Sequence, residues 1–111
     1  MQTPPKDPEL DHAAAILRLL GDRTRLAILA MIAVEEMSVT AIAESLGRPV
    51  PAVSQHLAKL RGAGLVKVRK DGATSYYTQP DEHLAQLVTS ALQLSEHALY
   101  AVPPHHRPKS S

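Results

Sequence analysis

Residues 51–64 read PAVSQHLAKLRGAG, and residues 65–78 continue with LVKVRKDGATSYYT. The first stretch predicts a helix over 51–61, because apolar residues recur at helical spacing and two glycines follow them. The second stretch alternates apolar and basic residues over 65–69 and then reaches Asp71-Gly72, a strong signal for a two-residue hairpin turn. A helix followed directly by a basic β-hairpin is therefore the part of the sequence that decides the fold.

Two further helices are predicted at the start of the chain. The first runs from Pro8 to Leu20, where Gly21 ends a series of apolar residues at helical spacing. Asp22 stands at the position of a helix N-cap, and the helix after it is apolar over most of its circumference. A helix of that kind is surrounded by the rest of the protein, so we expect it to be the central helix of the core.

A short third helix, a returning strand and a long last helix complete the prediction. Ser38 or Thr40 can cap the third helix, which Gly47 ends. The returning strand covers 74–78, and the last helix runs from 81 to about 100. The fold is therefore expected to be mainly α with a small β-hairpin, with about five helices and a two-stranded wing in the order of a winged helix-turn-helix.

The basic residues of the chain are unevenly distributed. The 111 residues include 12 Lys+Arg and 11 Asp+Glu, which gives a formal net charge of +1. No acidic residue lies between Glu44 and Asp71. Six basic residues fall in that stretch: Arg48, Lys59, Arg61, Lys67, Arg69 and Lys70. Such a surface can replace the counterions on nucleic-acid phosphates, although a merely solvated face can have the same composition.

The predicted helix 51–61 has the two faces of a DNA-recognition helix, one apolar and one polar. The polar side chains are short hydrogen-bonding groups or cations: Ser54, Gln55, His56, Lys59 and Arg61. Gln55 is suited to bidentate contacts with adenine, and Arg48 in the preceding turn to base edges or phosphate. The hairpin adds three cations for an adjacent groove or the backbone: Lys67, Arg69 and Lys70. His56 has a second interpretation, in which its ring packs under the turn.

Four segments resemble the ArsR/SmtB family of bacterial metal-responsive regulators. They are GDRTRL at 21–26, VSQHLAKLR at 53–61, AGLV at 63–66 and RKDG at 69–72. The resemblance covers roughly residues 9–100, which is almost the whole chain. It implies a winged-helix homodimer whose first and last helices form the interface, and which binds double-stranded DNA at an imperfect palindrome.

Composition excludes several other classes of protein. The chain has no Cys, so it has neither disulfides nor thiolate metal sites. It has no apolar run near the roughly 20 residues of a membrane span and no signal peptide, so a cytoplasmic protein without a membrane partner is expected. It has no phosphate-binding glycine loop or catalytic constellation, so it is not expected to be an enzyme. We expect a flexible arm over 1–7, one domain over 8–100 and a flexible tail over 101–111.

The last predicted helix carries metal-ligand residue types at both ends. They are Asp81 and His83 near its start, and Glu96 and His97 near its end. His83 and His97 are 14 residues apart, about 21 Å along a helix, so one helix cannot bring them to one ion. Two such helices packed antiparallel about a two-fold axis near residue 90 would place His83 of each copy beside His97 of the other. Asp81 has a second interpretation as the helix N-cap.

The resemblance to the family also implies a choice of metal. Its zinc-type pattern is Asp-x-His followed by two further ligands along the same helix, and three of the four positions are filled here: Asp81, His83 and His97. Leu94 occupies the fourth position and cannot bind a metal, which makes Zn(II) less fitting. Glu96 and the tail pair His105-His106 are replacement ligands, which resembles the nickel/cobalt-sensing (KmtR/NmtR-like) branch, although adjacent histidines in a proline-rich tail are often only solvated. Nitrogen and oxygen donors without sulfur suit Ni(II) or Co(II) better than soft ions.

The sequence therefore predicts a transcriptional regulator whose affinity for its operator changes with Ni(II) or Co(II) occupancy. The sign of that change stays open, because metal can release DNA, as in most relatives, or promote binding, and the protein can be a repressor or an activator. The alternative is a winged-helix regulator or adaptor without direct metal sensing. It would act through a partner protein or as an activator, and Leu94 would mark the loss of the site.

Overall fold

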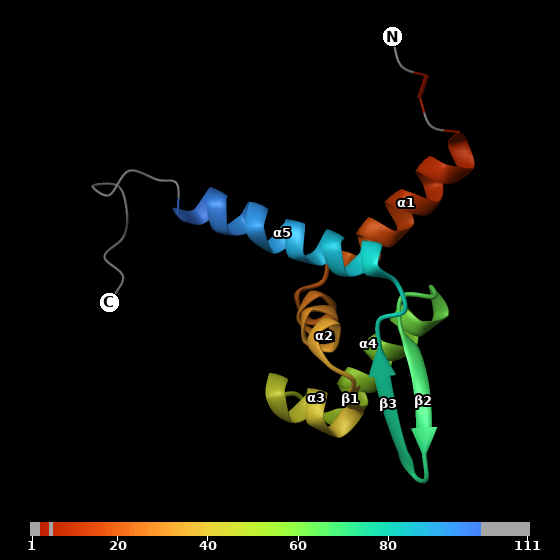
Figure 1. The fold of residues 1–111 in the computed structure, drawn as a ribbon, viewed down its shortest axis with the longest axis vertical. Helices are drawn as coiled ribbons and strands as arrows, with labels where there is room; N and C mark the ends of the chain where they lie inside the picture. Colours follow the sequence, from red (N-terminus) through yellow and green to blue (C-terminus); the bar gives the residue numbers. More distant parts are fainter. Residues whose placement is uncertain (1–2, 5, 101–111) are drawn as a thin grey trace.

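The computed structural model describes residues 3–4 and 6–100, which form a winged helix-turn-helix (Figure 1). In chain order the elements are α1 (Asp7–Leu20), α2 (Arg23–Val34), β1 (Met37–Ser38), α3 (Val39–Leu46), α4 (Val50–Gly62), β2 (Lys67–Asp71), β3 (Thr74–Thr78) and α5 (Glu82–Tyr100). The predicted mainly α architecture is confirmed, with α3 and α4 as the helix-turn-helix and β2 and β3 as the wing. In the part of the chain described, no helix is long and apolar enough to cross a membrane. His105 and His106 lie outside the described residues.

The central position predicted for the second helix is confirmed. Ile28, Leu29 and Ile32 of α2 are each no more than 3% exposed. Figure 1 shows α2 between α5 on one side and the helix-turn-helix on the other. Because α2 contacts each of the other helices, it is the frame against which α4 is held.

The two predicted caps hold the starts of α2 and α3. A side-chain oxygen of Asp22 accepts a hydrogen bond from the Arg25 N–H at 3.0 Å. Of the two candidates for α3, Ser38 is the cap, since its Oγ accepts from the Ala41 N–H at 3.1 Å. Each cap satisfies a backbone donor that has no partner within its helix.

The sheet has three strands where only the two-stranded wing was predicted. β1 pairs antiparallel with β3, with Met37 opposite Tyr77 and Ser38 opposite Tyr76. A strand of two residues is too short to leave an alternating pattern in the sequence. It nevertheless ties the segment after α2 to the base of the wing.

The first strand of the wing begins two residues later than the predicted 65–69. Leu65 still belongs to the turn that follows α4, because its N–H donates to the Leu60 carbonyl at 2.9 Å. Val66 is buried in the core with 3% exposure, so the pairing with β3 starts only at Lys67.

The turn of the hairpin also lies one residue later than predicted. Asp71 pairs with Thr74 across the two strands, so the loop consists of Gly72 and Ala73. Gly72 has a φ of +62°, in the left-handed region that such turns require. Smaller differences occur at helix ends: α1 begins at Asp7 rather than at Pro8.

Candidate nucleic-acid interface and metal-ligand residues

The exposed face of α4 carries four of the predicted DNA-binding side chains. Ser54, Gln55, Lys59 and Arg61 are all exposed. The opposite face packs into the core through fully buried side chains: Val53, Leu57 and Leu60. An α4 held in this way presents hydrogen-bonding and cationic groups outward, as a helix in the major groove must.

The turn between α3 and α4 fixes the position of Arg48. Gly47 has a φ of +63°, and the Arg48 N–H donates to the Ala43 carbonyl at 3.1 Å. This pattern closes the end of α3 and is strained for any residue with a Cβ at position 47. The Arg48 side chain is exposed beside the start of α4.

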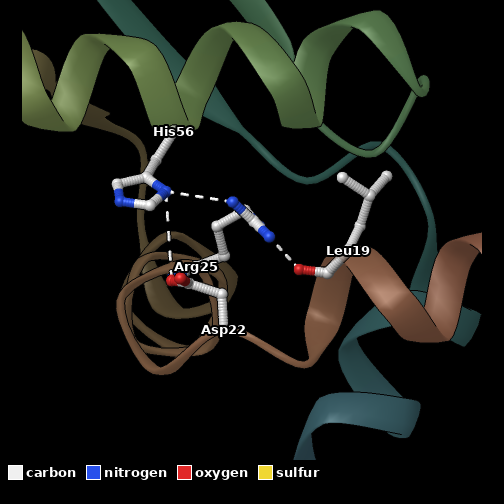
Figure 2. Close-up of polar contacts among 4 residues, drawn as sticks. All are labelled: Leu19, Asp22, Arg25 and His56. Atoms are coloured by element: carbon white, nitrogen blue, oxygen red, sulfur yellow. Dashed lines mark hydrogen bonds and ion pairs between the residues drawn. The ribbon is translucent and has the colours of Figure 1, made fainter.

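His56 lies apart from the exposed side chains of α4 and faces α2 (Figure 2). Its Nδ1 is 3.2 Å from Nη1 of Arg25 and 3.9 Å from the Asp22 carboxylate. The ring is half-buried, as the packing interpretation expects. A contact between His56 and DNA stays a prediction.

Arg25 is a residue that the sequence analysis did not single out. Its Nε donates to the Leu19 carbonyl at 2.6 Å while its Nη1 donates to His56, so one side chain joins the end of α1 to α4. The N–H of Arg25 lowers the pKa of Asp22, and the nearby charge of Arg25 lowers it further. The only sequence signal was the spacing of Arg25 three residues after the capping Asp22, which does not indicate the contact with α4.

The cations of the wing have different surroundings. Lys67 and Lys70 are exposed. The guanidinium of Arg69 instead binds Glu36, with Nε 3.0 Å and Nη2 2.6 Å from the two carboxylate oxygens. Hydrogen bonding between the two groups lowers the pKa of Glu36 and raises that of Arg69. Arg69 also lies over the ring of Tyr76, 4.8 Å from its centroid.

Glu36 therefore supplies a counter-charge that the acid-free stretch of sequence lacks. It lies just before β1, and the pairing of β1 with β3 brings it to the wing. Of the three predicted wing cations, Lys67 and Lys70 are the two whose side chains have no such partner among the described residues.

Asp81 and His83 come together at the start of α5. An Asp81 oxygen accepts from the His83 N–H at 2.7 Å and lies 3.1 Å from Nδ1 of the His83 ring. The pKa of Asp81 is lowered, mainly because of the hydrogen bond from the His83 backbone. The His83 side chain is 93% exposed, so its Nε2 is open to solvent. Asp81 is thus placed both as a helix cap and as a partner of the ring.

The other predicted ligands of α5 lie in its far half. Glu96 and His97 are exposed. Over residues 3–4 and 6–100, no three His, Asp or Glu side chains gather closely enough to hold an ion. A single chain therefore brings together two of the predicted donors, Asp81 and His83.

Apolar side chains on α1 and α5 are left exposed. Figure 1 shows both helices extending away from the body, and every residue of α5 after Val88 is exposed. The large exposed side chains of the two helices include Leu10, Leu17, Leu92, Leu94 and Leu99. Several large apolar side chains exposed on the same two helices are typical of an association surface.

Comparison with known proteins identifies the family. Residues 20–69 match a sequence family described as a helix-turn-helix domain. The chain is 46% identical to the HTH-type transcriptional regulator KmtR of Mycobacterium tuberculosis over 94% of this chain and 80% of that protein. It is 37% identical to the regulator NmtR of the same organism over 78% of this chain and 72% of that protein.

A solved structure agrees with the assignment. The homodimeric winged helix-turn-helix DNA-binding domain Mb0332 of Mycobacterium bovis, titled a possible ArsR-family regulator, superposes with a TM-score of 0.80. The match has 31% identity and covers 96% of this chain and 98% of that one. The family consists of DNA-binding proteins and not of enzymes. The chain belongs to the ArsR/SmtB family of winged-helix transcriptional regulators.

Proposed function

We propose that this regulator is a homodimer that senses Ni(II) or Co(II), and that metal binding at the ends of α5 changes its affinity for an imperfect palindromic operator. DNA contacts are assigned to the exposed residues of α4, to Arg48 and to the wing. The metal ligands are assigned to Asp81, His83, Glu96 and His97, with the tail pair His105-His106 as additional donors.

The observation that carries the proposal is the pairing of Asp81 with His83 at 3.1 Å on an exposed helix end. The pairing places a carboxylate and an imidazole, two of the donors assigned to the site, side by side at the exposed start of α5. A bound ion would supply a link between the two copies, and nitrogen and oxygen donors without sulfur fit Ni(II) or Co(II).

The exposed apolar faces of α1 and α5 support the dimer. Leu92 and Leu99 are 49% and 62% exposed, which is unfavourable in a monomer. The related Mb0332 domain is homodimeric by its title. Pairing through α5 would bring the two ligand-bearing ends of the helices together, which no single chain does.

The test is calorimetric titration of Ni(II), Co(II) and Zn(II) into metal-free protein. Both His83→Ala and His97→Ala are expected to lose the site, whereas His12→Ala, on the exposed face of α1, is the matched control. A DNA shift assay with and without each metal is expected to show a change of about 5–150-fold, the usual range of such coupling.

The same measurements decide between the proposal and its alternative. Exposed Leu94, at the position of a family ligand, favours a regulator or adaptor that does not sense metal directly. Metal binding weaker than about 10 µM, with no effect of either histidine substitution, would establish that alternative. Tight metal binding with unchanged DNA affinity would contradict the sensing function but support the metal site.

A further inference from the structure

A small cavity lies where the start of α2 meets the end of α3 and the turn into α4. Its volume is about 140 Å³, and it is lined by Arg23, Thr24, Ala27, Leu46 and Arg48. Ala27 and Leu46 form the apolar part of the wall. The other three residues contribute two positively charged guanidinium groups, which only donate hydrogen bonds, and one hydroxyl. The cavity is therefore suited to an anion.

The two arginines bring two positive charges to one opening. Both side chains are exposed, and among the described residues neither guanidinium is held in an ion pair or hydrogen bond. The backbone of Arg48 is nevertheless fixed, because its N–H closes the end of α3. A guanidinium anchored in this way can bind two oxygens of one phosphate side by side.

Thr24 adds a hydroxyl to the wall of the cavity. It is only 9% exposed, and within the described part of the chain its hydroxyl forms no hydrogen bond. The hydroxyl oxygen is open to the cavity, so a hydrogen-bonding group from outside the chain can reach it. The nearby acid, Asp22, is directed to Arg25 and His56 and does not line the cavity.

We propose that this cavity binds a phosphate group of the DNA backbone beside the groove that α4 enters. Thr24 would donate its hydroxyl, and Arg23 and Arg48 would neutralise the charge of the phosphate. The contact extends the DNA-binding surface to α2, beyond the helix-turn-helix and the wing. It rests on DNA binding by the protein and is independent of any metal.

The salt dependence of DNA binding tests the proposal. In Arg23→Ala, the slope of log affinity of the dimer against log salt concentration is expected to fall by about 2, because each of the two protomers loses one phosphate contact. The loss should be the same on operator and on unrelated DNA, because phosphate contacts carry no sequence information. Lys6→Ala, which removes one charge outside the cavity, is expected to leave the slope unchanged.

Thr24 provides a second test that leaves the charge intact. Thr24→Val keeps the shape of the side chain and is expected to lower affinity severalfold on both DNAs, whereas Thr24→Ser keeps the hydroxyl and should retain it. A thermal unfolding curve for each variant shows that the fold is kept. Wild-type affinity in Thr24→Val together with an unchanged slope in Arg23→Ala would overturn the proposal.

A free phosphate could use the same chemistry, so a third arm separates the two sources. Inorganic phosphate is titrated into the protein without DNA, and the backbone amide signals of residues 23–24 and 48 are followed by NMR. Phosphate binding that Arg23→Ala abolishes, combined with an unchanged DNA slope, would assign the cavity to a free anion and overturn the DNA contact. Failure of the wild-type protein to bind DNA would instead contradict the function on which the inference rests.

Discussion

Nη1 of Arg25 lies 3.2 Å from Nδ1 of His56, and this contact joins the central helix α2 to the helix that carries the predicted DNA contacts (Figure 2). Because a guanidinium can only donate, Nδ1 must accept, and the ring proton is then on Nε2. Arg25 is itself held by the Leu19 carbonyl at the end of α1. One side chain of α2 therefore contacts both α1 and α4.

Arg25→Lys is expected to weaken both folding and DNA binding. An ammonium on a single stem cannot hold Leu19 and His56 in the planar geometry of a guanidinium, so the stability should fall by about 1–3 kcal/mol. DNA affinity should fall severalfold in protein that is still folded. Urea unfolding and fluorescence anisotropy measure the two effects, with Arg18→Lys on α1 as the control. Reduced stability with wild-type affinity would show that the link supports the fold alone.

Glu36→Gln is expected to strengthen DNA binding at low salt. The substitution releases the guanidinium of Arg69 from its carboxylate partner and removes a negative charge from the base of the wing. The gain should disappear at high salt, where phosphate contacts weaken. Stability should change little, because the pair is exposed.

The neighbouring Glu35→Gln is the matched control for this effect. It makes the same change of charge but does not contact Arg69, as far as the described residues show. An equal gain in the two variants would mean that charge alone is responsible. A gain confined to Glu36→Gln would identify the released Arg69.

Asp22 is expected to make stability depend on pH in the acid range. Its pKa in the folded protein lies below the ordinary 3.8, mainly because the Arg25 N–H binds the charged form. The stabilisation is therefore complete well above pH 3.8 and is lost as the pH falls through the lowered folded-state pKa. Asp22→Ala should lose about 1 kcal/mol of stability near neutral pH. Its free energy of unfolding, measured with urea at a series of pH values, should depend less on pH in the acid range.

Asp22→Asn separates the cap from the charge. An asparagine oxygen still accepts from the Arg25 N–H, so most of the stability at neutral pH should be kept. The acid dependence should be lost, because the amide does not titrate. If the stability of Asp22→Asn falls as steeply in acid as that of the wild type, another carboxylate is responsible for the pH dependence.

Elements that depend on spacing within one segment could be predicted from the sequence. The buried face of α4 is such a case, since Val53, Leu57 and Leu60 have the periodicity of a helix and are fully buried. The caps at Asp22 and Ser38 are also local, because each side chain bonds an N–H three residues along. These features need no knowledge of the rest of the chain.

Contacts between distant segments could not be predicted in the same way. Arg69 meets Glu36 across 33 residues, and Arg25 meets His56 across 31. The first contact depends on β1, which is too short to give a periodic signal. For this reason the charge pattern placed Arg69 among the free cations of the wing, while its guanidinium is bound.

Leu94→His is expected to convert α5 toward a zinc site. In the proposed site, Leu94 occupies the one position of the zinc-type pattern that cannot bind metal, and it lines a shallow hollow of α5 together with Gln93 and His97. A histidine there would stand one helical turn before His97, on the same face. Together with His97 of the same chain and with Asp81 and His83 of the second copy, it would complete four ligands of the kind that Zn(II) prefers. Affinity for Zn(II) should rise at least about tenfold in a chelator competition, relative to the wild type.

Ser95→His is the matched control for this substitution. It adds an imidazole to the same exposed half of α5, but two residues before His97 and therefore on a different side of the helix. It should leave Zn(II) affinity near the wild-type value, because its ring cannot meet the other ligands. If both variants gain equally, the added histidine binds metal by itself, and the ligand assignment along α5 is wrong. If only Leu94→His gains, and the gain is lost on adding His83→Ala, the two ends of α5 contribute to one site, as only a pair of chains allows.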